Sequence, residues 1–156
     1  IRKIFAPIWI NGPIKKFVDD NVIIAGDAAG QAKPTTAGGI FSCGMAGIMA
    51  GQAVSTALTT NDSSKIINYE SVWRNKFGTE FEKQRLARKI LSRIDNQTIN
   101  KLFDSITPEI IDDISKKEDF DFHTSSIIKL LGIKRSLGAA QLLIGGELKK
   151  LVSHHD

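Results

Sequence analysis

Residues 22–40 constrain the fold of this chain most, because there an apolar run leads into a glycine-rich turn. The run over residues 22–25 is expected to form a strand that is buried on both faces. Gly26 allows a sharp turn, and Asp27 follows at the carboxyl end of the strand, where open α/β sheets bind their ligands. A carboxylate flanked only by Gly and Ala can accept hydrogen bonds from the hydroxyl groups of a ligand.

The second half of this segment is expected to lead into a helix. Pro34 stiffens the loop, and Thr35 and Thr36 supply hydroxyl groups that can cap a helix. Gly38 and Gly39 leave backbone N–H groups uncovered at the helix start, which predicts a site for negative charge. Together these features predict a site for a large anionic cofactor, and a purely structural Gly/Ala turn is the alternative.

The string GDAAGQAKPTTAGGI resembles the second flavin-binding motif of the geranylgeranyl reductase family, FAD-dependent enzymes with a fold of the p-hydroxybenzoate hydroxylase type. The resemblance implies that Asp27 bonds the ribityl chain of FAD and that residues 34–39 pass along the isoalloxazine ring. Ala37 stands where the family commonly has a third glycine, and its methyl group is expected to require a negative φ. The implied cofactor-binding residues are Gly26, Asp27, Ala28, Gly30, Pro34, Thr35, Thr36, Ala37, Gly38, Gly39 and Ile40.

The resemblance extends on both sides of the motif and covers about half of the chain. Upstream it includes residues 6–27, and downstream it includes the less specific pattern Tyr69, Trp73, Phe77 and Gly78. The GxGxxG fingerprint that binds the ADP half of FAD is absent, and the chain does not begin with Met. We therefore expect the C-terminal portion of a longer polypeptide, with residues 1–60 in an FAD-binding domain and residues 61–156 in a helical region over the substrate.

The predicted fold class is α/β for the whole protein and α+β for this chain, with strands and a flavin-binding helix before a mostly α-helical C-terminal region. Extended segments are expected over residues 1–25. Trp73, Phe77 and Phe81 recur every four residues and predict the core face of a long helix, with Gly78 as the site of a bend. The expected helices cover residues 36–58, 65–94, 97–106, 108–115, 124–131 and 136–152.

The segment 36–58 carries no charged residue and is long enough to raise the question of a membrane span. We expect it not to be one, because Gly, Ala, Ser and Thr dominate it and favour transfer into lipid only weakly. Gly44, Gly47 and Gly51 instead predict a slim helix face that packs closely against a sheet and the cofactor.

Charge and composition argue against several classes of protein. The net charge of +4 includes seven basic residues over 74–93 that are interleaved with glutamates, and no nucleic-acid-binding motif accompanies them. His123, His154 and His155 lack metal-ligand spacing, so no metal site is expected. Cys43 allows no intrachain disulfide, which suits a cytoplasmic location, with peripheral contact at a membrane as an open alternative.

Cys43 and Lys33 are expected to have no direct role in chemistry. We expect Cys43 to be a small buried thiol in preference to a redox group, and Lys33 to be an exposed loop lysine in preference to a contact for a phosphate or the ring edge. No catalytic side chain is identified. Apolar residues over 127–151 have enough surface to be buried either against the domain or around a lipid.

The resemblance implies a reductase that uses FAD to saturate C=C bonds of geranylgeranyl lipids. Its electrons would come from an external donor, either ferredoxin or NAD(P)H, and this chain alone is expected to be inactive. Two alternatives stay open. One is a flavoenzyme like electron-transfer flavoprotein dehydrogenases or hydroxylases, and the other is a noncatalytic helical module that binds lipid or a membrane surface.

Overall fold

The computed structural model describes residues 3, 5, 7–104, 106–117, 119–124 and 126. The chain divides into two compact units, Ile1–Leu86 and Ala87–Asp156. The predicted functional boundary after residue 60 stays a prediction. The predicted helix over 136–152, most of the one over 124–131, the apolar segment 127–151 and both C-terminal histidines lie outside the described residues.

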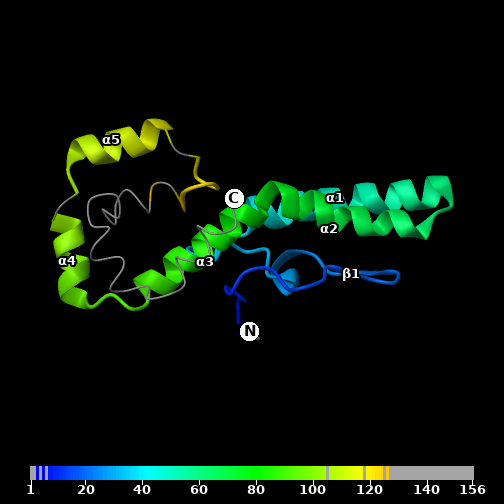
Figure 1. Cartoon of the computed structure of the whole chain (residues 1–156), viewed down its shortest axis with the longest axis horizontal. Helices are drawn as coiled ribbons and strands as arrows, with labels where there is room; N and C mark the ends of the chain where they lie inside the picture. The colour runs from blue at the N-terminus through cyan, green and yellow to red at the C-terminus, as the bar shows by residue number, and fades with distance from the viewer. Residues whose placement is uncertain are drawn as a thin grey trace, which may run out of the picture. The chain divides into compact units, whose positions relative to one another are not determined.

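The first unit consists of a small hairpin and a pair of long helical segments (Figure 1). Strands β1 (Val18–Asp19) and β2 (Val22–Ile23) pair antiparallel, with Val18 opposite Ile23. The helical elements that follow are the 3-10 turn η1 (Gly26–Ala29), α1 (Ile40–Thr60), the 3-10 turn η2 (Ser63–Ile67), α2 (Asn68–Trp73), the π-helical segment η3 (Arg74–Gly78) and α3 (Thr79–Leu91), which continues past Leu86 into the second unit.

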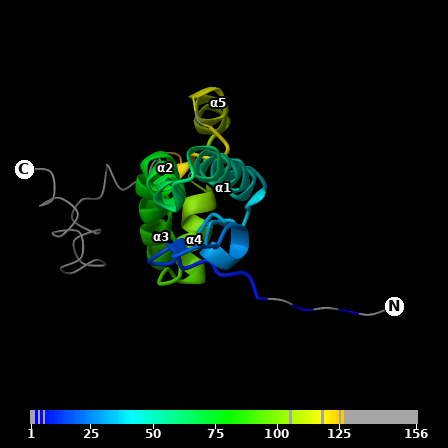
Figure 2. The same cartoon turned by 90° about the vertical axis from the view of Figure 1, so that its right-hand side faces the viewer.

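Helices α1 and α2 lie side by side, and both views show the β1–β2 hairpin running along them (Figures 1 and 2). The turn between the helices is specified locally. Asn61 ends α1 in the left-handed conformation with φ of 51°, and the Asp62 carboxylate accepts a hydrogen bond of 3.0 Å from the N–H of Ser64. The predicted helix over 36–58 is thus confirmed, with α1 shifted slightly toward the C-terminus, but neither Thr35 nor Thr36 caps its start.

One face of α1 is buried and the opposite face is open. The buried residues recur every three or four positions, namely Ser42, Ala46, Met49, Ala53 and Ala57. A Cβ atom placed on Gly44, Gly47 or Gly51 would meet nothing within 4 Å. The predicted close packing of this glycine face is therefore wrong within the described structure, because no element lies against it.

Helix α1 is also the one described helix that is long and apolar enough to cross a bilayer, a test that core helices of soluble proteins pass as well.

Aromatic side chains form the core of the first unit, as the sequence pattern predicts. Trp73, Phe77 and Phe81 are fully buried on one face of the helix. Phe17 packs edge-on against Trp73 with ring centroids 5.2 Å apart, and Tyr69 lies 5.7 Å from Phe17. Such ring pairs contribute about 0.5–1.5 kcal/mol each beyond the burial of their area. At Gly78, where we predicted a bend, the chain completes a π-helical turn.

Arg74 and Glu70, which form an ion pair on the second long helix, bind the segment before β1 through hydrogen bonds to its backbone. Arg74 donates to the carbonyl groups of Ile14 and Lys15 at 2.8 and 2.9 Å, and its guanidinium lies 4.4 Å from the centre of the Phe17 ring. Glu70 accepts the N–H of Phe17 and the Nε of Arg74, both at 2.8 Å. These bonds orient residues 14–17 along α2 without any further strand pairing.

The predicted buried strand over residues 22–25 is wrong in the described structure. Strand β2 contains only Val22 and Ile23, and the side chain of Val22 is 61% exposed. Its one sheet neighbour in the described part of the chain is β1, and none of residues 22–25 is buried. The mostly helical chain with one small described sheet is compatible with the predicted α+β class, and a flavin-binding parent fold stays a proposal.

The second unit contains the remaining two described helices, α4 (Asn96–Asp104) and α5 (Pro108–Lys117). Asp95 begins α4 by accepting the N–H of Thr98 at 2.7 Å, and Thr107 begins α5 by accepting the N–H of Ile110 at 3.4 Å. Pro108 occupies the first turn of α5, where a missing N–H has no cost. Both helices agree with the predicted positions.

Candidate functional site

The turn after β2 presents Asp27 to solvent. Gly26 has φ of 74°, in the left-handed region, and the turn closes with a hydrogen bond of 3.2 Å from Gln31 N to Gly26 O. Asp27 and Ala28 are exposed at its tip. The prediction that Gly26 turns the chain and leaves Asp27 accessible is therefore confirmed.

Gly30 is a glycine because of packing inside the protein. Its φ is 69°, and a Cβ there would overlap the carbonyl oxygen of Gly12 and lie 2.9 Å from Cδ1 of Trp9. Trp9 itself donates its Nε1–H to that carbonyl at 2.8 Å. This position requires glycine because it packs against residues 9–12 and has a positive φ. A role of Gly30 toward a ligand stays a prediction.

A buried polar network anchors the Asp27 turn to both long helices. The Gln31 side chain accepts the N–H of Gly26 at 2.7 Å and donates to the Tyr69 hydroxyl at 2.8 Å. Ser42, on the first turn of α1, donates to the carbonyl of Gln31 at 2.6 Å. Burial raises the pKa of the Tyr69 phenol above its ordinary value, so the phenol keeps its proton at neutral pH.

Sequence reasoning did not assign Gln31 or Ser42 to this region. The sequence signal for such a network was Tyr69, which precedes Trp73 in the aromatic pattern, because a buried Tyr needs a partner for its hydroxyl group.

The loop from residue 33 to residue 38 is closed by its own backbone. Lys33 N donates to Gly38 O and Ala37 N donates to Lys33 O, both at 2.9 Å, and Gly38 N lies 3.3 Å from the Thr36 hydroxyl. Ala37 has φ of 57°. Our expectation of a negative φ at Ala37 is wrong, because this closure places Ala37 in the left-handed region despite a cost of about 1–2 kcal/mol.

Lys33 is buried within this loop, with 3% of its surface exposed. The expectation of an exposed loop lysine is therefore wrong. A Cβ on Gly38 would lie 3.2 Å from Cε and 3.8 Å from Nζ of Lys33. The end of the lysine side chain therefore runs directly beside Gly38.

The start of α1 lies against the Asp27 turn. A Cβ on Gly39, which precedes α1, would lie 3.2 Å from Oδ1 of Asp27 and 2.8 Å from Sγ of Cys43. No side chain in the described structure caps the helix, and Ile40 is 98% exposed. The predicted proximity of Asp27 to the helix start is thus present, and the N-terminus of a helix favours such a negative charge.

Cys43 faces Asp27 from the first turn of α1, with Sγ 3.5 Å from Oδ1. Burial raises the pKa of the Cys43 thiol to about 11, and the hydrogen bond and charge of Asp27 add to the effect. The thiol therefore stays protonated at neutral pH, whereas nucleophilic cysteines have lowered pKa values. The expectation of a buried thiol is met only in part, because Cys43 is half-buried, and the thiol acts as a donor toward Asp27.

The predicted site residues differ in accessibility. Pro34 and Gly30 are buried, and the hydroxyl of Thr35 lies 3.3 Å from the side chain of Gln84 on α3. The exposed members are Asp27, Ala28, Thr36 and Ile40, and the half-buried ones are Gly26, Thr35, Ala37, Gly38 and Gly39. The accessible part of the site is therefore the tip of the turn together with the start of α1.

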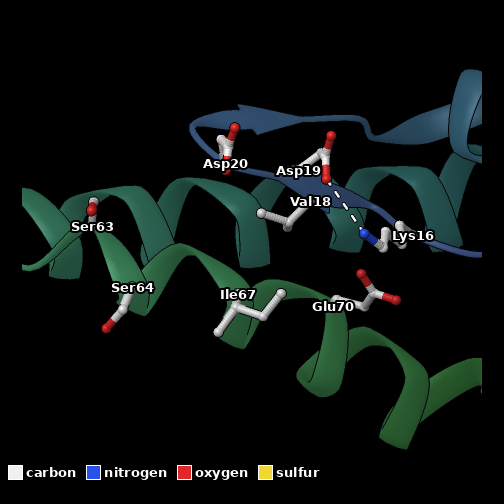
Figure 3. Close-up of a pocket in the computed structure, with 8 residues that line it drawn as sticks. All are labelled: Lys16, Val18, Asp19, Asp20, Ser63, Ser64, Ile67 and Glu70. Atoms are coloured by element: carbon white, nitrogen blue, oxygen red, sulfur yellow. Dashed lines mark hydrogen bonds and ion pairs between the residues drawn. The ribbon is translucent and has the colours of Figure 1, made fainter.

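A cavity of about 420 Å³ lies elsewhere in the first unit, between β1 and the start of the second long helix (Figure 3). Lys16 and Asp19 form a 3.5 Å ion pair at its edge. It contains none of the predicted site residues, and its lining residues are Lys16, Val18, Asp19, Asp20, Ser63, Ser64, Ile67 and Glu70. Across the described residues, no group of three or more His, Cys, Asp or Glu side chains could hold a metal ion.

Comparison with known proteins identifies the family. No family model and no solved structure match the chain. It is 31% identical over 120 residues to the digeranylgeranylglycerophospholipid reductase of Methanothrix thermoacetophila, a match that covers 76% of this chain and 30% of that enzyme. The reductase of the same name from Methanocaldococcus jannaschii is 33% identical over 111 residues, which are 70% of this chain and 28% of the enzyme.

An uncharacterized protein from Methanocaldococcus jannaschii is 33% identical over 121 residues, which are 77% of this chain and 31% of that protein. The chain thus spans about three tenths of the length of these curated relatives. These matches show that the chain belongs to the geranylgeranyl reductase family.

Proposed function

We propose that this chain forms the ring-side part of the FAD site in a reductase that saturates C=C bonds of geranylgeranyl lipids. The observation that carries the proposal is the contact between the Asp27 turn and the start of α1, where a Cβ on Gly39 would lie 3.2 Å from the Asp27 carboxylate. The proposal is further supported by the names of relatives, which are reductases of digeranylgeranylglycerophospholipid.

The residues at this contact fit the chemistry of FAD. Asp27 is an exposed carboxylate and can accept hydrogen bonds from the hydroxyl groups of a ribityl chain. The uncapped start of α1 offers backbone N–H groups toward negative charge, which is the ordinary anion site of a helix. When bound, the flavin would supply the hydride that reduces an isolated C=C bond.

The surrounding residues would keep these groups in place. Gln31 holds the turn through Gly26, and Ser42 ties the same glutamine to α1. Because the side chain of Gln31 holds the turn and its backbone carbonyl is bonded to α1, Asp27 and the helix start keep a constant relative position. Fixed dipoles and charges of this kind need no reorganisation during a reaction, which is the basis of electrostatic catalysis.

Substrate, donor and location are parts of the same proposal. The lipid would be an isoprenoid chain, and the electrons would come from ferredoxin or NAD(P)H. A cytoplasmic protein with peripheral contact at the membrane suits a lipid substrate. The names of relatives support the lipid substrate alone.

The test uses the complete polypeptide that carries these residues. It is loaded with FAD, reduced with dithionite without oxygen, and mixed with a geranylgeranyl lipid. The expected result is reoxidation of the flavin together with a gain of one H₂ per double bond in the mass of the lipid. Reoxidation by a quinone but by no isoprenoid would favour an electron-transfer dehydrogenase, and a protein that binds no flavin would favour the noncatalytic module.

A further inference from the structure

Lys33 is a buried charge in a loop whose neighbours are accessible. Lysine is almost never fully buried unless the surrounding protein interacts with it, because an ammonium group loses its hydration there. Only 3% of Lys33 is exposed, whereas Thr36 in the same loop is exposed. Burial of this charge costs desolvation free energy, whereas an apolar side chain would fill the same volume without that cost.

The side chain of Lys33 has a defined position behind the loop. It passes Gly38 with Cε and Nζ 3.2 and 3.8 Å from the position of a Cβ there. Two backbone hydrogen bonds of 2.9 Å join Lys33 to Ala37 and Gly38. Backbone and side chain of Lys33 therefore hold the same loop, and the ammonium group is fixed immediately behind Gly38.

We propose that the ammonium group of Lys33 is a fixed positive charge that strengthens the binding of reduced FAD relative to oxidised FAD. This inference rests on the proposed function, in which residues 34–39 lie along the flavin ring. Two-electron reduction of the ring at neutral pH takes up two electrons and one proton, so the ring gains one negative charge. A nearby cation stabilises that charge, and more strongly in a site from which water is excluded.

The alternative is that Lys33 only fills the space beside Gly38. The two roles differ in a measurable way. Loss of a filler weakens the binding of both redox states by the same factor, and the potential of the bound flavin stays unchanged. Loss of a charge weakens the reduced state more, and the potential falls.

The experiment uses the complete polypeptide and compares the wild type with Lys33→Met, Lys33→Gln and Lys33→Arg. Lys16→Met is the matched control, because Lys16 lies in the same unit and its side chain is 75% exposed. For each variant, the dissociation constant of oxidised FAD and the midpoint potential of the bound FAD are measured. Together these give the affinity of the reduced state, and dithionite supplies the electrons.

We expect both neutral variants to lower the ratio of reduced to oxidised affinity about tenfold, which is a fall of ~30 mV for a two-electron couple. Lys33→Arg should keep most of the potential, and Lys16→Met should keep all of it. An unchanged potential in Lys33→Met or Lys33→Gln with FAD still bound would overturn the inference and leave the proposed function intact. A wild type that binds no FAD would instead overturn the proposed function, and the inference with it.

Discussion

The Tyr69 hydroxyl and the Gln31 side-chain amide form a buried hydrogen bond of 2.8 Å that joins residues 38 positions apart in the sequence. On its other side, the amide oxygen of Gln31 accepts the N–H of Gly26 at 2.7 Å. One buried amide therefore connects the aromatic core of α2 to the turn that presents Asp27. The position of the candidate site depends on the core through this pair.

Replacement of Gln31 by Leu should destabilise the first unit strongly. The leucine would leave the N–H of Gly26 without its partner and would remove the donor to Tyr69, and an unsatisfied buried polar group costs about 1–3 kcal/mol. Urea unfolding followed by tryptophan fluorescence should show a loss of about 2–4 kcal/mol. Tyr69→Phe is the comparison: it leaves one amide N–H of Gln31 without its acceptor and should cost about 1–3 kcal/mol. Equal and small effects of both variants would contradict the network.

Ala37→Gly should stabilise the protein. Ala37 has φ of 57°, a conformation that costs an alanine about 1–2 kcal/mol and a glycine almost nothing. Part of this gain is lost to the greater freedom of glycine in the unfolded chain, so a net gain of about 0.5–1 kcal/mol is expected. The matched control is Ala50→Gly within α1, which should lower stability by about 0.5–1 kcal/mol. Destabilisation by both variants would contradict the left-handed conformation of Ala37.

Glu70 should make stability depend on pH. Burial of Glu70 opposes its ionisation, but the bonds from Phe17 and Arg74 outweigh burial and hold the pKa of its carboxyl below the ordinary value of 4.5. A lowered folded-state pKa contributes stability that is complete above pH 4.5 and is lost as the pH falls through the folded-state value. Glu70→Gln should therefore cost about 1.5–3 kcal/mol at pH 7, and the difference from wild type should shrink in acid.

This pH dependence is measured by urea unfolding at pH 7 and at several acidic values, with Glu82→Gln as the control. Glu82 is an exposed residue on α3, so its replacement should change stability little at any pH. A deficit of Glu70→Gln that persists unchanged at low pH would show that the carboxylate charge is not what holds residues 14–17.

Local patterns predicted the elements that depend on neighbouring residues. The spacing of Trp73, Phe77 and Phe81 located the core face, because a four-residue repeat places side chains on one side of a helix. Gly26 located the turn, since it acts within a few residues. These features needed no knowledge of distant contacts.

Features set by distant or loop contacts were missed. The burial of Lys33 depends on a loop that folds back over its own side chain, and a single lysine gives no sequence signal for this. The positive φ of Ala37 follows from the closure of the same loop. The strand over 22–25 was overestimated because an apolar run predicts a covered strand only where other strands or helices lie on it, and Val22 is largely exposed.

The central claim is that Asp27 binds the cofactor, and the most direct measurement is a fluorescence titration of FAD into the complete polypeptide with Asp27→Ala. Asp19→Ala is the control, because Asp19 lies in the same unit and its side chain is 81% exposed. Loss of a charge-assisted hydrogen bond of about 1.5–3 kcal/mol predicts FAD affinity roughly ten- to hundredfold weaker for Asp27→Ala and unchanged for Asp19→Ala. Wild-type affinity in Asp27→Ala would contradict the account.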